Sequence, residues 1–138
     1  MNRITAIFVT LSAAVVLAAS VASAAAPSAF KLTTTQGRKG TFTFTSYEFL
    51  KTNGTSVTKP AKSGSLMVDV QITSGSEKQL FKKGKLKAAS LHVSATLPKP
   101  QNFTYTLGKP KITSVDFVHG SLGEVGAVSI AYTSIRKS

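Results

Sequence analysis

Apolar side chains recur at every second position along most of the sequence. In residues 66–72 four aliphatic side chains occupy alternate positions, and Asp69 and Gln71 lie between them. Successive side chains of a β-strand point to opposite faces of a sheet, so this alternation predicts a half-buried strand. Near Thr45 and Ser46 the alternation shifts by one residue, which predicts a β-bulge. The whole pattern predicts about seven strands, in residues 30–34, 41–49, 66–72, 89–97, 103–107, 112–118 and 128–132.

Turn-forming residues separate these strands at regular intervals. Short strands with regularly spaced turns are typical of an all-β barrel or sandwich. The longest connection, residues 51–64, is polar and basic, and a loop of this length is often functional. We therefore expect it to contribute to assembly with other chains. Its candidate assembly residues are Lys51, Asn53, Lys59, Pro60 and Lys62.

One segment breaks the two-residue period and predicts a short helix. Ser76 followed three positions later by Gln79 has the spacing of a capping box. Leu80 and Phe81 would form the buried face of about two helical turns. Gly84 can then adopt the left-handed conformation that ends a helix.

Several segments carry a resemblance to a known family. The first three are Val68-Asp69-Val70-Gln71-Ile72-Thr73, Ser76-Glu77-Lys78-Gln79-Leu80-Phe81, and Gly84-Lys85 before the strand of residues 87–93. They resemble the middle of the type VI secretion tube family, also called haemolysin-coregulated proteins (Hcp). Residues 103–107, 112–115 and 127–132 resemble that family's closing hairpin. The similarity covers about residues 29–135, nearly all of the chain after its N-terminal segment.

The resemblance implies a fold and a way of assembling. The expected fold is all-β, a small antiparallel β-barrel of about seven strands with one short α-helix. Members of the family stack as hexameric rings into a tube and shelter small effectors, and they have no catalytic residue to carry over. The resemblance therefore implies a homo-oligomer that meets secretion-apparatus or effector proteins. Where the family has a longer loop after its first strand, this chain has Gln36-Gly37-Arg38-Lys39.

The N-terminus has the features of a secretory signal. Met1-Asn2-Arg3 supplies a positive start, residues 4–21 carry no charge, and Ala22-Ser23-Ala24 supplies a cleavage site. A membrane anchor would need about 20 apolar residues followed by a charged stop, whereas no charge follows until Lys31. We therefore predict a cleaved signal in residues 1–24 and a single Hcp-like domain in residues 25–138. The mature protein is expected to be secreted or periplasmic, with no stable membrane span.

Positive charge dominates the composition. The chain has 17 Lys and Arg against 5 Asp and Glu, and it has no cysteine. The missing cysteines exclude disulfides and zinc–thiolate sites. The excess of positive charge predicts attraction to polyanions, such as the anionic polymers of a cell envelope. Because aromatic residues are not interleaved with the basic ones, nucleic acid is not the expected partner.

The most concentrated basic run follows the predicted helix. Lys78 and Lys82 are four residues apart and would share a helix face, while Lys85 and Lys87 would lie on one face of the next strand. The run is a candidate binding patch. The alternative is that its lysines only keep the end of a helix soluble. The residues of the patch are Lys78, Lys82, Lys83, Lys85 and Lys87.

The sequence lacks the arrangement of residues that catalysis would need. Asp116, His119 and Ser121 lie within six residues at the end of a strand, where alternation sends their side chains in different directions. The only imidazoles are those of His92 and His119, and no cluster of carboxylates accompanies them. His92 lies on the polar face of its strand and is expected to be solvated. We therefore predict a protein that is not an enzyme and has no cofactor and no metal site.

Two functions remain open at this point. The first is an exported structural protein that resembles type VI tube subunits and assembles into rings or binds a protein partner. The second is a monomeric basic module that binds an anionic polymer of the envelope. The second function predicts that binding weakens steeply as salt rises, because salt screens exposed charges.

Overall fold

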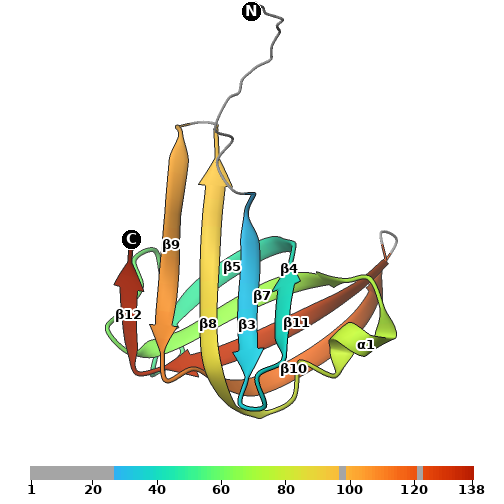
Figure 1. The fold of residues 1–138 in the computed structure, drawn as a ribbon. Coiled ribbons are helices and arrows are strands. Elements are labelled where there is room, and N and C mark those ends of the chain that lie inside the picture. The colour runs from blue at the N-terminus through green and yellow to red at the C-terminus, as the bar shows by residue number, and fades with distance from the viewer. Residues whose placement is uncertain (1–26, 97–98, 121–122) are drawn as a thin grey trace, which may run out of the picture.

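The computed structural model describes residues 27–96, 99–120 and 123–138, so the predicted signal segment lies outside the described residues. The described part of the chain is all-β, with ten antiparallel strands and one short helix (Figure 1). In chain order the elements are β3 (Ala29–Thr34), β4 (Lys39–Phe42), β5 (Phe44–Lys51), β6 (Ser56–Val57), β7 (Gly64–Ile72), α1 (Gly75–Lys78), β8 (Gly84–Ala95), β9 (Gln101–Gly108), β10 (Lys111–Gly120), β11 (Gly123–Tyr132) and β12 (Ser134–Lys137).

The strands are arranged in two layers that face each other (Figure 1). The front layer has the strand order β12-β9-β8-β3-β4, and the back layer has the order β10-β11-β7-β5-β6. The chain passes from front to back between β4 and β5, and the foot of β8 pairs with β10. Above the body of the molecule, β8 and β9 project as a long hairpin (Figure 1).

The strand ladder does not close into a barrel. Among the described residues β12 pairs with β9 alone and β6 pairs with β5 alone, so these two short strands are the ends of the path. Pro60 lies in the connection that follows β6, and proline has no amide hydrogen with which to continue a ladder. The sequence had predicted a barrel of about seven strands, and the structure corrects this to ten strands in an open, folded-over sheet.

The differences in strand number come from short elements. β6 is a two-residue strand inside the predicted long loop, and β12 has a polar and basic sequence with little alternation. The predicted strand of residues 41–49 is divided at Thr43 into the end of β4 and the start of β5. The β-bulge predicted near Ser46 is confirmed, because the register of β5 against β7 shifts between Phe44 and Ser46.

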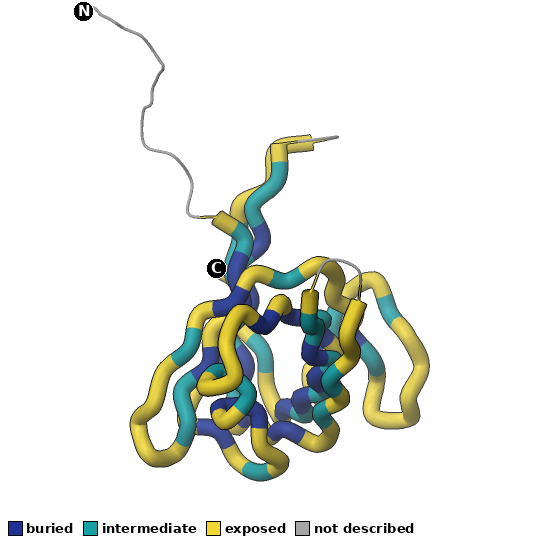
Figure 2. The backbone as a smooth tube through the Cα atoms, turned by 90° about the vertical axis from the view of Figure 1, so that its right-hand side faces the viewer, coloured by how far each residue is buried: buried dark blue, intermediate teal, exposed yellow. Residues whose placement is uncertain are grey.

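The core lies between the two layers and is built from the predicted inward faces. All four aliphatic side chains of β7 predicted to point inward are buried. In Figure 2 the buried residues concentrate where the layers face each other, and the outer half of the β8–β9 hairpin is more exposed. The largest fully buried side chains are Phe30, Leu32, Leu66, Leu91, Ile112 and Ile130.

The helix is shorter and begins earlier than predicted. α1 spans Gly75–Lys78, with Ser74 as the N-cap in place of Ser76. Leu80 and Phe81 follow the helix and are buried as predicted, because Phe81 packs against Phe42 of β4 at a ring-centre distance of 4.6 Å. Gly84 has the predicted positive φ, of 133°, but it starts β8 instead of ending a helix.

Glu77, and not Gln79, closes the N-terminal turn. Its carboxylate oxygen Oε1 accepts hydrogen bonds from the Thr73 amide at 2.7 Å, the Thr73 hydroxyl at 2.9 Å and the Ser74 amide at 3.3 Å. The bond from the Thr73 amide contributes most to lowering the pKa of Glu77 below its ordinary value of 4.5. The carboxylate thus ties the end of β7 to the start of the segment that leads to the basic patch.

Replacing Glu77 by glutamine is expected to lower the free energy of unfolding by about 1 kcal/mol at neutral pH, because the glutamine oxygen is a weaker acceptor than a carboxylate. A carboxylate whose pKa is lowered by folding stabilises the fold at pH values above its ordinary pKa. It loses this contribution as the pH falls through the lower pKa of the folded state. The difference between wild type and E77Q should therefore shrink below pH 4.5.

Urea denaturation followed by circular dichroism at several acidic pH values measures this difference. D116N is the matched control, since Asp116 has no side-chain hydrogen bond among the described residues. A gap between wild type and E77Q that stays constant as the solution is acidified would contradict this role of Glu77.

Candidate functional site

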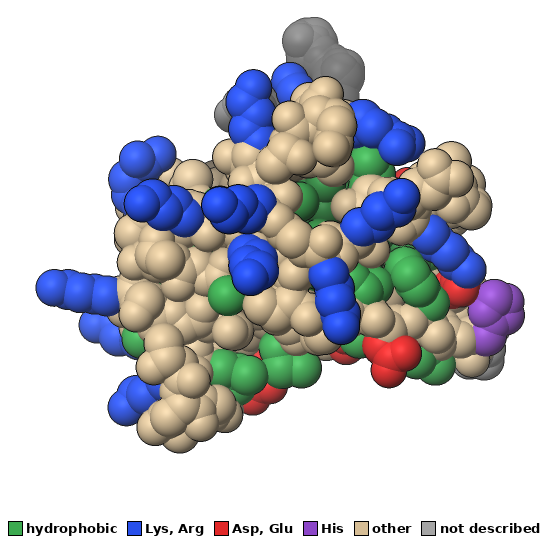
Figure 3. Space-filling model, turned by 90° about the horizontal axis from the view of Figure 1, so that it is seen from below, with side chains coloured by type: hydrophobic (Ala, Val, Ile, Leu, Met, Phe, Trp, Pro, Cys, Tyr) green, Lys and Arg blue, Asp and Glu red, His purple; other side chains and the backbone are tan. Residues whose placement is uncertain are grey.

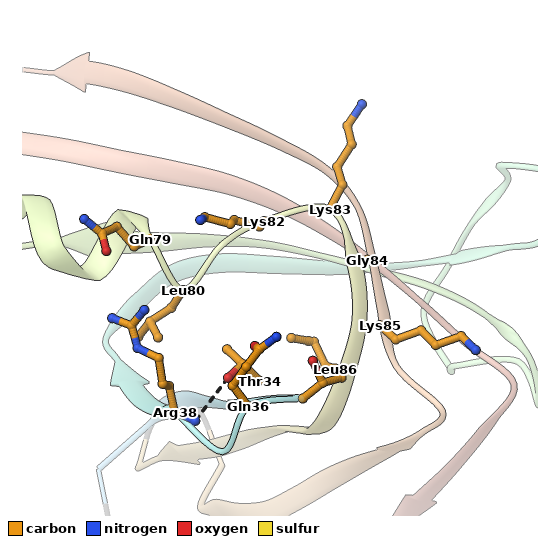
Figure 4. Close-up of a pocket in the computed structure, with 11 residues that line it drawn as sticks. Thr34, Gln36, Arg38, Gln79, Leu80, Lys82, Lys83, Gly84, Lys85 and Leu86 are labelled. Atoms are coloured by element: carbon orange, nitrogen blue, oxygen red, sulfur yellow. Dashed lines mark hydrogen bonds between the residues drawn. The ribbon is translucent and has the colours of Figure 1, made fainter.

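A basic hollow lies at the foot of the molecule, between the β3–β4 turn and the segment that follows α1 (Figure 4). Its volume is about 650 Å³, and four of its lining residues are cationic. None of the described residues that line it is acidic. We call it the basic pocket, and its cationic residues are Arg38, Lys82, Lys83 and Lys85.

The structure brings together three of the five lysines of the predicted patch. Lys87 is exposed on β8 but does not line the basic pocket. Lys78 is turned away to the back layer, where its Nζ lies 2.5 Å from Glu124 Oε2 and 5.2 Å from the centre of the Phe117 ring. Lys78 and Lys82 do not share a helix face as predicted, because the helix ends at Lys78. Lys78 is therefore paired with Glu124 and does not line the basic pocket.

Arg38 is the member of the basic pocket that the sequence did not indicate. It lies in the β3–β4 turn, about forty-five residues before Lys83. The turn is held by bonds from the Thr34 amide to the Arg38 carbonyl (2.8 Å) and from the Arg38 amide to Thr34 Oγ1 (3.0 Å). Gly37 supplies the positive φ, of 89°, that the turn requires. The sequence shows Gly37-Arg38-Lys39 as a basic turn. Only the pairing of β3 with β8 brings this turn to the pocket that Lys82 also lines.

The first half of the predicted assembly loop is a small hairpin. The Lys51 amide donates to the Thr55 carbonyl at 2.8 Å, and the Thr55 amide donates to Asn53 Oδ1 at 3.0 Å. The next two residues form β6 and pair with β5. Asn53 therefore shapes a turn within the chain, and its side chain is engaged there.

The second half of the loop spans the gap between β6 and β12. Lys59 and Pro60 line a hollow of about 350 Å³ together with Tyr105, Ile135 and Lys137. The Tyr132 hydroxyl donates to the Ala61 carbonyl at 2.9 Å, and burial raises the pKa of Tyr132 above its ordinary value. Lys62 is exposed. This half of the loop therefore covers the open edge of the sheet.

Charge is divided between the two layers. The front-layer strands carry six Lys and Arg, and none of their described residues is acidic. The back-layer strands carry four of the five acidic residues and only two lysines, one at the end of β5 and one at the start of β10. Figure 3, seen from below, shows most cationic side chains gathered on one side and the carboxylates along the other. The molecule therefore has a basic side and an acidic side.

The outer face of the back layer presents its carboxylates in register. Asp69 pairs with Ala127, which pairs with Asp116, and residues paired across a sheet point to the same face. In the next row Glu48 pairs with Met67. Met67 and Val118 are exposed here by 39% and 55%. We call this surface, Glu48, Met67, Asp69, Asp116 and Val118, the acidic face.

The two histidines do not combine into a catalytic or metal site. His92 was expected to be solvated, but its Nδ1 lies 2.7 Å from Thr104 Oγ1, and its Nε2 is buried without a hydrogen-bond partner among the described residues. His119 is exposed and lies 3.7 Å from Glu124. Asp116 is three positions before His119 on one strand, so the two point to opposite faces. Ser121 lies outside the described residues.

Comparison with known proteins places the fold. The sequence matches no protein-family model and no curated protein. Solved structures do match. The fold resembles that of Hcp1. The Hcp1 protein from E. coli EAEC 042 pathovar is 15% identical, with a TM-score of 0.52 over 83% of this chain and 98% of the Hcp1 chain. A chain of the anti-feeding prophage (AFP) baseplate is 7% identical, with the same TM-score over 86% of this chain and 97% of that one.

The resemblance to type VI tube proteins expected from the sequence is therefore confirmed at the level of the fold. The second of these neighbours is, by its name, part of a baseplate assembly. Within residues 27–96, 99–120 and 123–138, no helix has the length and apolar character needed to cross a membrane. No described group of three or more His, Asp or Glu side chains could hold a metal ion.

Proposed function

We propose that this protein is an exported structural subunit that self-associates, with the acidic face of one copy docked on the basic front layer of the next. The proposal includes cleavage after residue 24 and a secreted or periplasmic location, as the N-terminal sequence suggests. The similarity of the fold to Hcp1 and to an AFP baseplate chain supports a structural role. The division of charge between the two layers is the observation that carries the proposal.

The two surfaces are complementary in charge. The acidic face is a sheet surface with three carboxylates around exposed Met67 and Val118. The outer side of the front layer offers Lys31 and Lys39, which line a shallow hollow of about 470 Å³ with Thr41 and Ala88. Facing potentials of opposite sign steer association and fix its register. Apolar side chains inside a polar rim are typical of protein interfaces.

A contact of this kind joins different surfaces of the two copies. Such a front-to-back contact repeats until a ring closes or a filament grows. By its resemblance to the tube family, this chain would form the hexameric ring. The loop that contains Lys59 and Lys62 covers the open edge of the sheet, outside the two docking surfaces. It therefore remains available to contact a neighbouring ring, an effector or a component of the secretion apparatus.

Sedimentation velocity of the purified protein at rising concentration tests the proposal. We expect species heavier than the monomer at low ionic strength, and we expect them to dissociate as salt screens the facing charges. A single species of monomer mass at every concentration and salt level would overturn self-association. Heavy species that are insensitive to salt would overturn the docking of acidic on basic surfaces.

A further inference from the structure

We propose that the basic pocket binds a linear polymer of phosphate groups. This inference goes beyond self-association, because the pocket lies at the foot of the molecule and not on the acidic face or in the hollow of Lys31 and Lys39. The proposed binding residues are the cationic residues of the basic pocket, and they differ from the patch of five lysines predicted from the sequence. Arg38 joins the set, and Lys78 leaves it.

The first argument is that two lysines are register partners beside the pocket. Lys85 at the foot of β8 is the register partner of Lys111 on β10. Like charges directly opposite each other on antiparallel strands destabilise a sheet. Neither lysine forms a salt bridge with a described carboxylate. A bound polyanion would reduce this repulsion. The lysine pair therefore fits an anion-binding site better than a surface whose lysines serve only solubility.

The second argument comes from the directions of the side chains. In Figure 4 Arg38 and Lys82 extend toward Gln79, Lys83 points away from the pocket on another side, and Lys85 points in the opposite direction to Lys82. A single small anion cannot contact all four cations at once. A polymer that crosses the pocket can contact them in turn, and it would then release one counterion for each phosphate neutralised.

The third argument concerns the kind of anion. The guanidinium of Arg38 presents paired donors that match phosphate oxygens. The side-chain amides of Gln36 and Gln79 add neutral donors to the lining. Each internal phosphate of a linear polymer carries one negative charge on two acceptor oxygens, and these charges lie on the backbone itself, so they are spaced more closely than the side-chain carboxylates of a polypeptide. None of the described lining residues is aromatic, so the pocket offers no platform for stacked bases.

The test uses the purified full chain and long-chain inorganic polyphosphate, with binding measured by calorimetry over a series of salt concentrations. The site variant is R38Q/K82Q/K83Q. The matched control is K59Q/K62Q/K99Q, which loses the same charge from the loop over the open edge and from the segment after β8. We expect the site variant to bind at least about tenfold more weakly and to lose about three units of salt slope, one for each cation removed. The control should keep the wild-type slope.

Thermal unfolding supplies a second readout. Polyphosphate should raise the melting temperature of wild type and of the control but not of the site variant, because a ligand stabilises the state that binds it. Circular dichroism verifies that both triple variants are folded.

Three results would overturn the proposal. The first is an equal loss of affinity in the two triple variants, which means that only overall charge matters. The second is binding of polyglutamate or orthophosphate as tight as binding of polyphosphate at the same concentration of charge. The third is tighter binding of single-stranded oligothymidylate, which would make the surface a nucleic-acid site.

Discussion

Replacing Asp116 by lysine is expected to weaken self-association by roughly tenfold to hundredfold and to leave the fold intact. Asp116 is exposed on β10, and its side chain has no hydrogen bond or ion pair among the described residues, so the monomer loses little. In the proposed contact it faces the basic front layer of the next copy. Lysine there would place like charges together at a cost of about 1–3 kcal/mol, which corresponds to that loss of affinity.

Sedimentation velocity measures the change as a shift of the concentration at which heavier species appear. T96K/Q101K is the matched control, because it adds the same charge at two exposed positions of the β8–β9 hairpin. The control should assemble as the wild type does. A second variant, D116K/K31E, moves a carboxylate onto the opposite surface and should recover part of the loss. Equal behaviour of D116K and the control would count against docking through the acidic face.

Replacing Phe49 by alanine is expected to lower the free energy of unfolding by about 3–5 kcal/mol. Phe49 is only 3% exposed, on β5, the back-layer strand next to the edge strand β6. Its ring lies 5.1 Å from that of Tyr105 in the front layer and 6.3 Å from that of Tyr132, both edge to face. The contact with Tyr105 joins the two layers at the open edge, where no ladder of hydrogen bonds among the described residues joins them, so aromatic packing supplies the connection there.

Urea denaturation of wild type and F49A, followed by circular dichroism, gives this difference directly. F103A is the matched control, because Phe103 contacts Tyr105 from the side but is only partly buried. Its loss should be clearly smaller, since less apolar area leaves water when that ring packs. If the two variants lost the same stability, the layers would not depend on Phe49 for their connection at the open edge.

The candidate site was predicted in part from the sequence. Lys82, Lys83 and Lys85 are neighbours in the chain, so the sequence shows them as a group wherever the strands lie. The pairing of Lys78 with Glu124 was not visible, because it joins α1 to a strand more than forty residues later. The helix was misplaced by two residues because Ser74 and Ser76 both suit an N-cap. The three bonds to Glu77, two of them from Thr73, favour the earlier start.

The sequence by itself determined the longer strands, their inward faces and the excess of positive charge. These properties are local or additive: a period of two orients side chains whichever strands become neighbours, and net charge is a sum. The tertiary structure alone decided that four of the five acidic residues collect in one layer, that Arg38 lines the same pocket as Lys82, and that the sheet stays open between β6 and β12. Each of these depends on which distant strands pair. That choice is made by long-range contacts such as Phe30 with Leu91, which no local pattern encodes.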